Sequence, residues 1–571
     1  MTVGQAEPPV PPIRAADADS AVRGAADGAP AAGPAGRAGS RANVTLSVVI
    51  ALALLSPLAI LAVDADRSGW SEVGRVLFRP LSYTLLRNTV ELTVLVMLAA
   101  AVVGSTAAWW TERTALPARR LWTVLLVLPV AVPDFVTGYA WHTIEPTGAG
   151  LPMSTLVMTL GTYPLVYLPV AAALRRTDPA MEETARSMGV RGPAVFLRVT
   201  LPLVRTALLG GCVLVALTVL SEYGAFEILR FQTFTTEIFT EFQFDPDAAG
   251  ALSIPLVLLG LLLLGIDAAV PRRTVARAAA RRAPSRSGSR WAVVPRLLAL
   301  TCLVGLGVGV PIGTLGYWMA QSHETTLPAA ATLGQATWNT LDFSAWGAAV
   351  SVLLALPVAM LTFRRTSAAR TTIERATYVT QALPGVVIAL SLVFFTTRYL
   401  FGLYQTSTLL IAAYAIMHFP LALVCVKASV AQAPPALTDV GRSLGRGPVA
   451  VFFQVTLPLI APGLAAGFCL VFLTAVTELT ATLVLAPIGV QTLATQFWAF
   501  QSEVAYGAAA PYALVIVALA AVPGALLGLW FDREQSGRRR GRARLRGRGN
   551  GRSAGTGTEA SGAGPLAADA P

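Results

Sequence analysis

The stretch RSMGVRGPAVFLRVTLPL (residues 186–203) recurs later in the chain as RSLGRGPVAVFFQVTLPL (residues 442–459). Gly189 in the first copy corresponds to Gly445 in the second, 256 positions further on. Each copy is polar and basic, and each lies between long apolar stretches. A polar loop that is duplicated within a duplicated membrane domain indicates a docking surface that is used twice, by a partner with two-fold symmetry.

The composition is that of a polytopic membrane protein. The 571 residues are 54% hydrophobic and only 13% charged, and repeated apolar runs of about 20 residues are each long enough to cross a bilayer. The net charge of +12 could also suggest nucleic-acid binding. However, nearly all the basic residues are arginines in the tails and in the loops on one side, as the positive-inside rule predicts.

The apolar runs predict an all-α fold with about twelve spans, six in each half of the chain. The expected spans are 44–63, 89–111, 121–144, 151–174, 203–223, 250–270, 292–318, 344–363, 378–400, 406–427, 459–480 and 510–530. Arginines follow the even-numbered spans, whereas the loop after span five is acidic (Glu222, Glu227, Glu237, Glu241, Asp245 and Asp247). Both termini are therefore expected in the cytoplasm of a plasma-membrane protein.

This pattern divides the chain into two halves and three polar segments. We expect permease-like halves at 43–270 and 292–531, joined by an Arg/Ala/Ser-rich cytoplasmic linker at 271–291. The Ala/Gly/Pro-rich tail 1–42 and the basic tail 532–571 lack the apolar residues needed for a core and are expected to be disordered. No apolar stretch within the first 42 residues resembles a cleavable signal peptide.

The duplication extends well beyond the repeated loop. Asn88-Thr89 corresponds to Asn339-Thr340, and Pro133 to Pro384, both at an offset of 251. The change of offset to 256 implies a five-residue insertion in the second half, after its fourth span. Six spans per half is an even number, so the halves run in the same orientation and are related by an axis along the membrane normal.

The repeated loop resembles the EAA loop of ABC-importer permeases. The pattern of that loop is Glu-Ala-Ala, three residues, Gly, nine residues, an aliphatic residue, one residue, then Leu-Pro. The first copy follows it with Glu183, Thr184, Ala185, Gly189, Val199, Leu201 and Pro202, and the second with Asp439, Val440, Gly441, Gly445, Val455, Leu457 and Pro458. The first copy departs at Thr184, and the second replaces Glu-Ala-Ala by Asp-Val-Gly.

The resemblance implies an L-shaped element, in which a short helix, a glycine break and a second short helix dock into a separate ATPase subunit. Leu-Pro then opens the next span, where a proline in the first turn is tolerated. It further implies two copies of that ATPase and an extracytoplasmic solute-binding protein as partners. The single lysine, Lys427, lies in no GxxxxGK[ST] motif, so we expect ATP to be used by the partner and no cofactor to be bound by this chain.

In having both permease halves fused in one chain, the protein resembles the ferric-iron importers most closely. Two segments also favour iron as the solute: LPVAVPDFVTGYAW (128–141) and SEYGAFEILRFQTFTTEIF (221–239). Thiamine, phosphonate, polyamine or another small solute remains an alternative. Outside this class, a twelve-span secondary transporter also has parallel halves. An intramembrane enzyme is disfavoured, because the chain has no HExxH or GxSxG motif.

Three acidic residues are candidates for the translocation pathway. Glu222 and Glu478 correspond to each other near the outer ends of the fifth spans, and Asp134 follows Pro133 in the third. A carboxylate deep in a bilayer costs roughly 2.5–3.5 kcal/mol on insertion scales, so such residues usually face a cavity. The alternatives are interfacial acids in contact with water, or acids that orient the binding protein. The counterpart of Asp134 is Gly385. The dispersed cysteines and histidines predict neither a disulfide nor a metal site.

Overall fold

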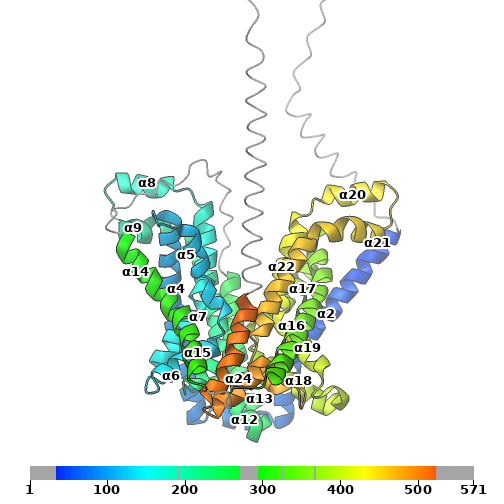
Figure 1. The fold of residues 1–571 in the computed structure, drawn as a ribbon. Coiled ribbons are helices and arrows are strands. Elements are labelled where there is room, and N and C mark those ends of the chain that lie inside the picture. Colours follow the sequence, from blue (N-terminus) through cyan, green and yellow to red (C-terminus); the bar gives the residue numbers. More distant parts are fainter. Residues whose placement is uncertain (1–33, 191, 270–292, 323–326, 365–367, 522–571) are drawn as a thin grey trace, which may run out of the picture.

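The computed structural model describes residues 34–190, 192–269, 293–322, 327–364 and 368–521, and throughout these ranges every regular element is a helix (Figure 1). The predicted linker 271–291 and basic tail 532–571 lie outside the described residues, as does the tail up to residue 33. The described part of that tail, 34–42, belongs to the first long helix.

The long helices correspond to the predicted spans. In chain order they are α2 (Pro34–Ser68), α4 (Pro80–Arg113), α7 (Leu151–Arg176), α10 (Leu201–Ser221), α13 (Pro246–Ala269), α14 (Val293–Val304) continuing into α15 (Val310–Gln321), α16 (Ala330–Arg364), α19 (Ser407–Gln432) and α22 (Leu457–Val476). Among the described residues, nine helices are long and apolar enough to cross a membrane, and two bent pairs bring the number to eleven. The twelfth predicted span, 510–530, is described only in part, within the apolar helix Tyr506–Ala521.

The third span of each half, which the sequence predicted as one segment, is broken in the structure. Residues 119–131 and α6 (Asp134–Ile144) meet at 88°, and residues 370–382 and α18 (Gly385–Tyr399) meet at 102°. A proline disfavours helical backbone at the residue before it. Val132 and Leu383, which precede the two matched prolines, accordingly have extended backbone. The segments before the breaks contain α5 (Arg119–Leu125) and α17 (Ala368–Tyr378).

The long helices form two arms that diverge from a common apex (Figure 1). One buried core joins α4, α7 and α10, and it includes Leu300 of α14. The other joins α16, α19 and α22, and it includes Ile50 and Leu54 of α2. Each half therefore contributes its first span to the other half's arm, so the sequence halves do not coincide with the arms.

The α2 helix is also fastened to the second half by polar contacts. The side-chain amide of Asn43 donates to the Pro357 carbonyl at 3.3 Å. At the other end of the helix, the buried Asp64 forms an ion pair with Arg398 of α18. These contacts and the shared apolar core fix α2 against the second half along most of its length.

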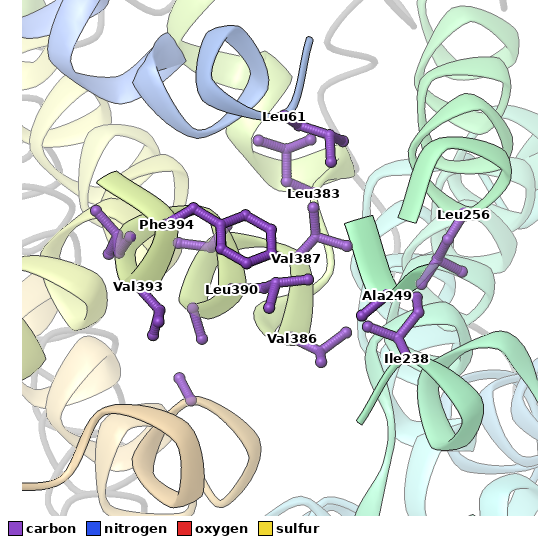
Figure 2. Close-up of a cluster of buried hydrophobic side chains, with 14 of the residues drawn as sticks. Leu61, Ile238, Ala249, Leu256, Leu383, Val386, Val387, Leu390, Val393 and Phe394 are labelled. Carbon is purple, nitrogen blue, oxygen red and sulfur yellow. The ribbon is translucent and has the colours of Figure 1, made fainter. Parts of the chain in front are cut away.

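The apex is a core shared by both halves. Its short helices are α3 (Trp70–Leu77), α11 (Gly224–Ile228), α12 (Phe234–Phe244), α23 (Thr480–Leu485) and α24 (Leu493–Ser502). Figure 2 shows Leu61 of α2, Ile238 of α12 and Leu256 of α13 gathered around side chains of α18. A second cluster packs α6 against α24 and the helix Tyr506–Ala521.

Candidate functional site

The two repeated loops lie at the ends of the arms that point away from the apex (Figure 1). In the first loop, α8 (Ala180–Ser187) ends at Gly189, whose φ is +85°. The backbone N–H groups of Gly189 and Val190 donate to the carbonyls of Arg186 and Ala185, at 2.9 and 3.1 Å. This pattern is a Schellman cap, which requires left-handed backbone and so favours glycine.

The second loop forms the same turn despite its weaker sequence match. Here α20 (Pro435–Ser443) ends at Gly445 with φ +77°, and Arg446 N–H donates to the Gly441 carbonyl at 3.3 Å. The predicted short helix, glycine break and second short helix are therefore present in both copies. The second short helices are α9 (Gly192–Val195) and α21 (Pro448–Val451).

Leu201-Pro202 and Leu457-Pro458 begin α10 and α22, as the sequence predicts, although no break in the helix precedes them. The backbone is already helical at Thr200 and Thr456, and the short helices run through π-helical turns at Phe196–Thr200 and Phe452–Thr456 into α10 and α22. A proline inside a helix lacks one N–H and its ring displaces a carbonyl. A wider turn just before Pro202 or Pro458 accommodates both effects.

Sequence reasoning missed the residue that fastens α8 to its arm. Glu183 is half-buried, but its neighbour Glu182 is only 3% exposed and pairs with Arg113 at 3.1 Å. Arg113 also donates to the carbonyls of Leu174 and Thr177, at 2.9 and 3.1 Å. Helical spacing puts Glu182 on the same face as the buried Ala185, a signal already present in the sequence.

A second buried acid extends this network at the end of α4. Glu112, also 3% exposed, pairs with Arg175 of α7 at 2.8 Å and with Arg119 of α5. Arg186 in α8 reaches Glu182 at 3.5 Å. Charge-assisted hydrogen bonds thus join α8 to the C-terminal ends of α4 and α7. Such bonds are stronger than neutral ones.

The α20 helix of the second loop packs closely against the segment that follows its turn. Gly441, the counterpart of Ala185, is buried, and a Cβ there would lie 3.3 Å from a methyl group of Val451. Thr438, the counterpart of Glu182, is 7% exposed. Asp439 is exposed. Among the remaining pattern residues, Leu201 and Leu457 are half-buried, and Pro202 and Pro458 are exposed.

Both loop helices, α8 and α20, present apolar side chains to the exterior. Met181 and Met188 of the first loop are 58% and 72% exposed, and Leu437 and Leu444 of the second are 45% and 74% exposed. Large exposed apolar residues on an otherwise polar loop are typical of a protein interface.

Glu222 and Glu478 occupy matching positions where α10 and α22 end at the apex. The Glu222 carboxylate accepts from Ala225 N–H at 2.9 Å, and the Glu478 carboxylate accepts from Ala481 N–H at 3.1 Å. Each therefore caps the short helix that follows, α11 or α23. Both side chains are half-buried.

Asp134 lies at the break in the third span, as the first residue of α6. Glu222 is close enough to Asp134 and Glu478 to feel their charges, so the three acids form one electrostatic group. A Cβ at Gly161 of α7 would collide with the Asp134 carboxylate, so the glycine makes room for this side chain. Throughout the described ranges, no three His, Cys, Asp or Glu side chains come together as metal ligands.

Aromatic side chains from both halves meet beside these acids. Tyr223, 3% exposed, packs against Phe239 of α12 with ring centroids 4.4 Å apart. It also contacts Trp498 of α24 at 5.3 Å. A Cβ at Gly224 would lie 2.6 Å from Leu479 of the second half. The apex is therefore closed by tightly packed side chains while the arms are apart at their other ends.

A family profile and several individual proteins resemble this chain. Residues 100–275 and 347–536 both match the profile of the binding-protein-dependent transport system inner membrane component. The Fe(3+)-transport system permease protein of Haemophilus influenzae is 34% identical over 497 residues, covering 84% of this chain and 97% of that protein.

Two further relatives are more distant. The ferric transport system permease protein of Actinobacillus pleuropneumoniae is 21% identical over 80% of this chain and 72% of its own length. The molybdenum transport system permease protein of Mycobacterium tuberculosis is 29% identical over 39% of this chain and 91% of its own length. The last match thus covers less than half of the present chain.

Proposed function

Because the chain belongs to the binding-protein-dependent transport system inner membrane component family, we propose that it is the membrane subunit of an ATP-driven importer and carries both permease halves. Two copies of a separate ATPase dock on α8 and α20, and an extracytoplasmic protein delivers the solute. The observation that carries this proposal is the repeated Schellman-capped helix, which exposes apolar side chains at the free end of each arm.

The geometry suggests how ATP use would drive transport. Closure of an ATPase dimer would bring α8 and α20 together, and the arms would follow because each docking helix is fixed to its arm. The present arrangement, with the arms apart and the apex packed shut, corresponds to an inward-facing state. Since both loops carry arginines, we place them, and both termini, in the cytoplasm. With both termini on one side the number of spans must be even, and twelve spans in two parallel sets of six meet this condition.

Ferric iron is the solute that we propose. Two relatives that extend over most of this chain are named as ferric transport permeases. Glu222 lies within electrostatic reach of both Asp134 and Glu478, so three carboxyl groups gather at the closed end of the arms, where their ionised forms would attract a cation. Their role is electrostatic guidance rather than chelation, so the delivering protein supplies most of the selectivity.

The proposal is tested by reconstituting the full chain with its ATPase and binding protein in liposomes. We expect stable co-purification of the ATPase and ATP-dependent entry of ferric iron, with no entry when ATP is omitted. Uptake driven by an ion gradient without any ATPase would instead identify a secondary transporter. Uptake of thiamine, a phosphonate or a polyamine in preference to iron would keep the class and overturn the substrate.

Orientation is tested separately by labelling single introduced cysteines. Cysteines at Gly192 and Gly447 should react only from the cytoplasmic side, and cysteines at Gln243 and Ser502 only from outside. Labelling of 192 and 447 from opposite sides would contradict the parallel arrangement of the halves.

A further inference from the structure

The Asn-Thr pair that recurs in both halves makes the same contacts twice. Asn88 of α4 donates its side-chain amide to the Gln232 carbonyl at 3.0 Å. The adjacent Thr89, 3% exposed, accepts a hydrogen bond from Phe234 N–H at 3.2 Å. Gln232 lies in the loop that leads into α12, and Phe234 is the first residue of that helix.

The second half repeats the arrangement on α16. Asn339 donates to the Gln491 carbonyl at 2.7 Å, and Thr340, 5% exposed, accepts from Leu493 N–H at 2.9 Å. Gln491 lies in the loop that leads into α24, and Leu493 is the first residue of that helix. Conserved contacts at both positions, in spite of many differences between the halves, point to a shared task.

The helices that follow these loops are seated on the opposite half. Ile238 of α12 packs among side chains of α18, which belongs to the second half (Figure 2). Phe497 of α24 packs against Phe135 and Tyr139 of α6, in the first half, with ring centroids 5.3 and 5.4 Å apart. Each Asn-Thr pair therefore joins an arm helix to an apex helix that rests on the other half.

These apex helices also carry the aromatic side chains that close the pathway. Phe239 of α12 and Trp498 of α24 occupy equivalent positions, and both contact Tyr223 beside Glu222. Any change in the angle between the arms must move α12 relative to α24, provided that each remains attached to its own arm. Within the described residues, the Asn-Thr pairs supply the only side-chain hydrogen bonds from α4 or α16 to the loops before α12 and α24 and to the first residues of these helices.

We propose that Asn88-Thr89 and Asn339-Thr340 are positioning residues that couple arm movement to opening of an outer gate formed by α12 and α24. The hydroxyl of each threonine accepts a hydrogen bond from the first N–H of α12 or α24. Each asparagine donates to a carbonyl in the loop just before that helix. Loss of these bonds would let the arms close without pulling the gate apart. The inference rests on the proposed importer function, because only then does arm closure follow ATP use.

The test uses the full transporter in liposomes and measures ferric iron transported per ATP hydrolysed. Thr89→Val with Thr340→Val removes both hydroxyls with little change in shape. We expect transport per ATP to fall about fivefold, because two buried N–H groups lose their partners, while ATPase activity without binding protein rises. Thr89→Ser with Thr340→Ser retains both hydroxyls and should restore the ratio.

A matched control comes from the same two helices. Thr93→Val with Thr337→Val removes hydroxyls that bond only within their own helices, to the Thr89 and Leu333 carbonyls. This control should keep the wild-type ratio. An equal ratio in the control and in the Thr89/Thr340 variant would overturn the gate role, even if the latter is less heat-stable.

Two further outcomes separate this inference from the function it rests on. If the Thr89/Thr340 variant does not fold, Asn88→Ala with Asn339→Ala alters half-buried side chains and should reproduce the loss of coupling. An unchanged ratio there would also overturn the gate role.

If the wild-type chain does not assemble with an ATPase at all, the importer function itself fails. If it assembles and transports iron, but the Thr89/Thr340 and Asn88/Asn339 variants transport equally well, only the gate role fails.

Discussion

In the first half, the docking helix α8 is held to its arm by the buried ion pair of Glu182 with Arg113. In the second half, position 438 is a threonine, and α20 instead rests with Gly441 against Val451. The backbone of the two loops is nevertheless the same through the glycine turn. One loop geometry is thus supported by charge in one arm and by close apolar packing in the other.

The same difference recurs at the apex. Asp134 begins α6 after the break in the first half, whereas Gly385 stands at that position in the second. Arg79, before α4, pairs with Glu241 of α12 at 2.7 Å. The equivalents of those two residues are Ala330 and Phe500, and Phe500 stacks on Tyr512.

These differences show which properties of a repeat are constrained. Replacing a buried ion pair by well-packed apolar groups is often neutral, whereas removing one partner alone is costly. The Arg79–Glu241 pair shows such a joint replacement, since both of its residues have apolar equivalents in the second half. In the loop only the acid differs, because Arg113 corresponds to Arg364. The turn glycines and the Asn-Thr pairs have no such substitute, and they are the same in both halves.

The largest effect should follow from removing the feature that the halves share. Gly189→Val with Gly445→Val forces β-branched residues into left-handed backbone, which costs on the order of 1–3 kcal/mol at each site. Space is not limiting, because a Cβ at either glycine would meet no atom within 4 Å. We expect membrane insertion to persist, while ATPase association and ATP-driven uptake fall more than tenfold, as measured by co-purification and liposome uptake.

Gly447 provides the control for that experiment. Its φ is −63°, a value that any residue adopts, and a Cβ there would also have open space. Gly447→Ala should therefore leave association and uptake unchanged. Normal uptake by the double valine variant would rule out docking through these turns.

The second prediction separates the two modes of support. Glu182→Gln leaves Arg113 buried without its carboxylate, which we expect to destabilise the first arm by about 3–5 kcal/mol. Thr438→Val changes a neutral side chain at the equivalent position and should cost about 1 kcal/mol. Thermal unfolding of the purified chain measures both, and uptake should fall in the same order.

A double replacement sharpens this comparison. Arg113→Met with Glu182→Met removes the whole pair and should recover part of the stability lost in either single variant, giving a coupling energy in a double-mutant cycle. Strictly additive losses would mean that the two residues act independently and that the first loop is held by other contacts.

The sequence contains most of what is needed to predict the loops but less of what fixes their surroundings. The spacing of Gly189 and Gly445 predicts the turns because only a residue free of a Cβ adopts that backbone easily. The role of Glu182 could have been inferred from its helical spacing to Ala185. Its partner Arg113 could not be distinguished from other arginines placed by the membrane, because the contact joins residues 69 positions apart.

Broken spans and exchanged helices were harder still to anticipate. Hydropathy measures how apolar a segment is and not whether it bends, so only the matched prolines marked the breaks. The exchange of α2 and α14 between the arms depends on packing surfaces far apart in sequence. The positions of Glu222 and Glu478 at the ends of the fifth spans were predicted, whereas their capping bonds were not.

A third, intermediate effect concerns the charges at the apex. Glu222→Gln with Glu478→Gln keeps the size and hydrogen bonding of both side chains, and we expect ferric uptake at limiting iron to fall about threefold with the ATPase still bound. Adding Asp134→Asn to this double variant removes the third carboxyl group and should lower uptake further. Initial rates in liposomes at several iron concentrations measure the effect.

The binding protein decides between two explanations of such a loss. If the acids act on the cation in the pathway, excess binding protein should not restore uptake. A defect that disappears when the binding protein is in excess would mean that the acids orient that protein instead. An undiminished rate at limiting iron would remove both roles.

The smallest effect should come from the ion pair that has apolar equivalents in the second half. Arg79 is 30% exposed and Glu241 19% exposed, so their pairing should contribute about 1 kcal/mol or less. Arg79→Gln should therefore leave uptake within about twofold of wild type and lower the thermal stability slightly. Arg75→Gln, which breaks a more exposed pair with Glu72 on α3, is the control and should have no measurable effect.

The Arg79 variant should also depend on pH in a defined direction. Burial raises the pKa of Glu237 in α12, its neighbour Glu241 adds to the rise, and Arg79 opposes it. A carboxyl whose folded-state pKa is raised favours the folded state at low pH, and this contribution is lost as the pH rises through that pKa. Without Arg79, ionised Glu237 and Glu241 repel each other in a half-buried site, so the stability defect should grow with pH and shrink under acidic conditions. Thermal unfolding of wild type and Arg79→Gln across this range measures the difference, and a defect that does not change with pH would show that Arg79 supports α12 through packing of its side chain rather than through charge.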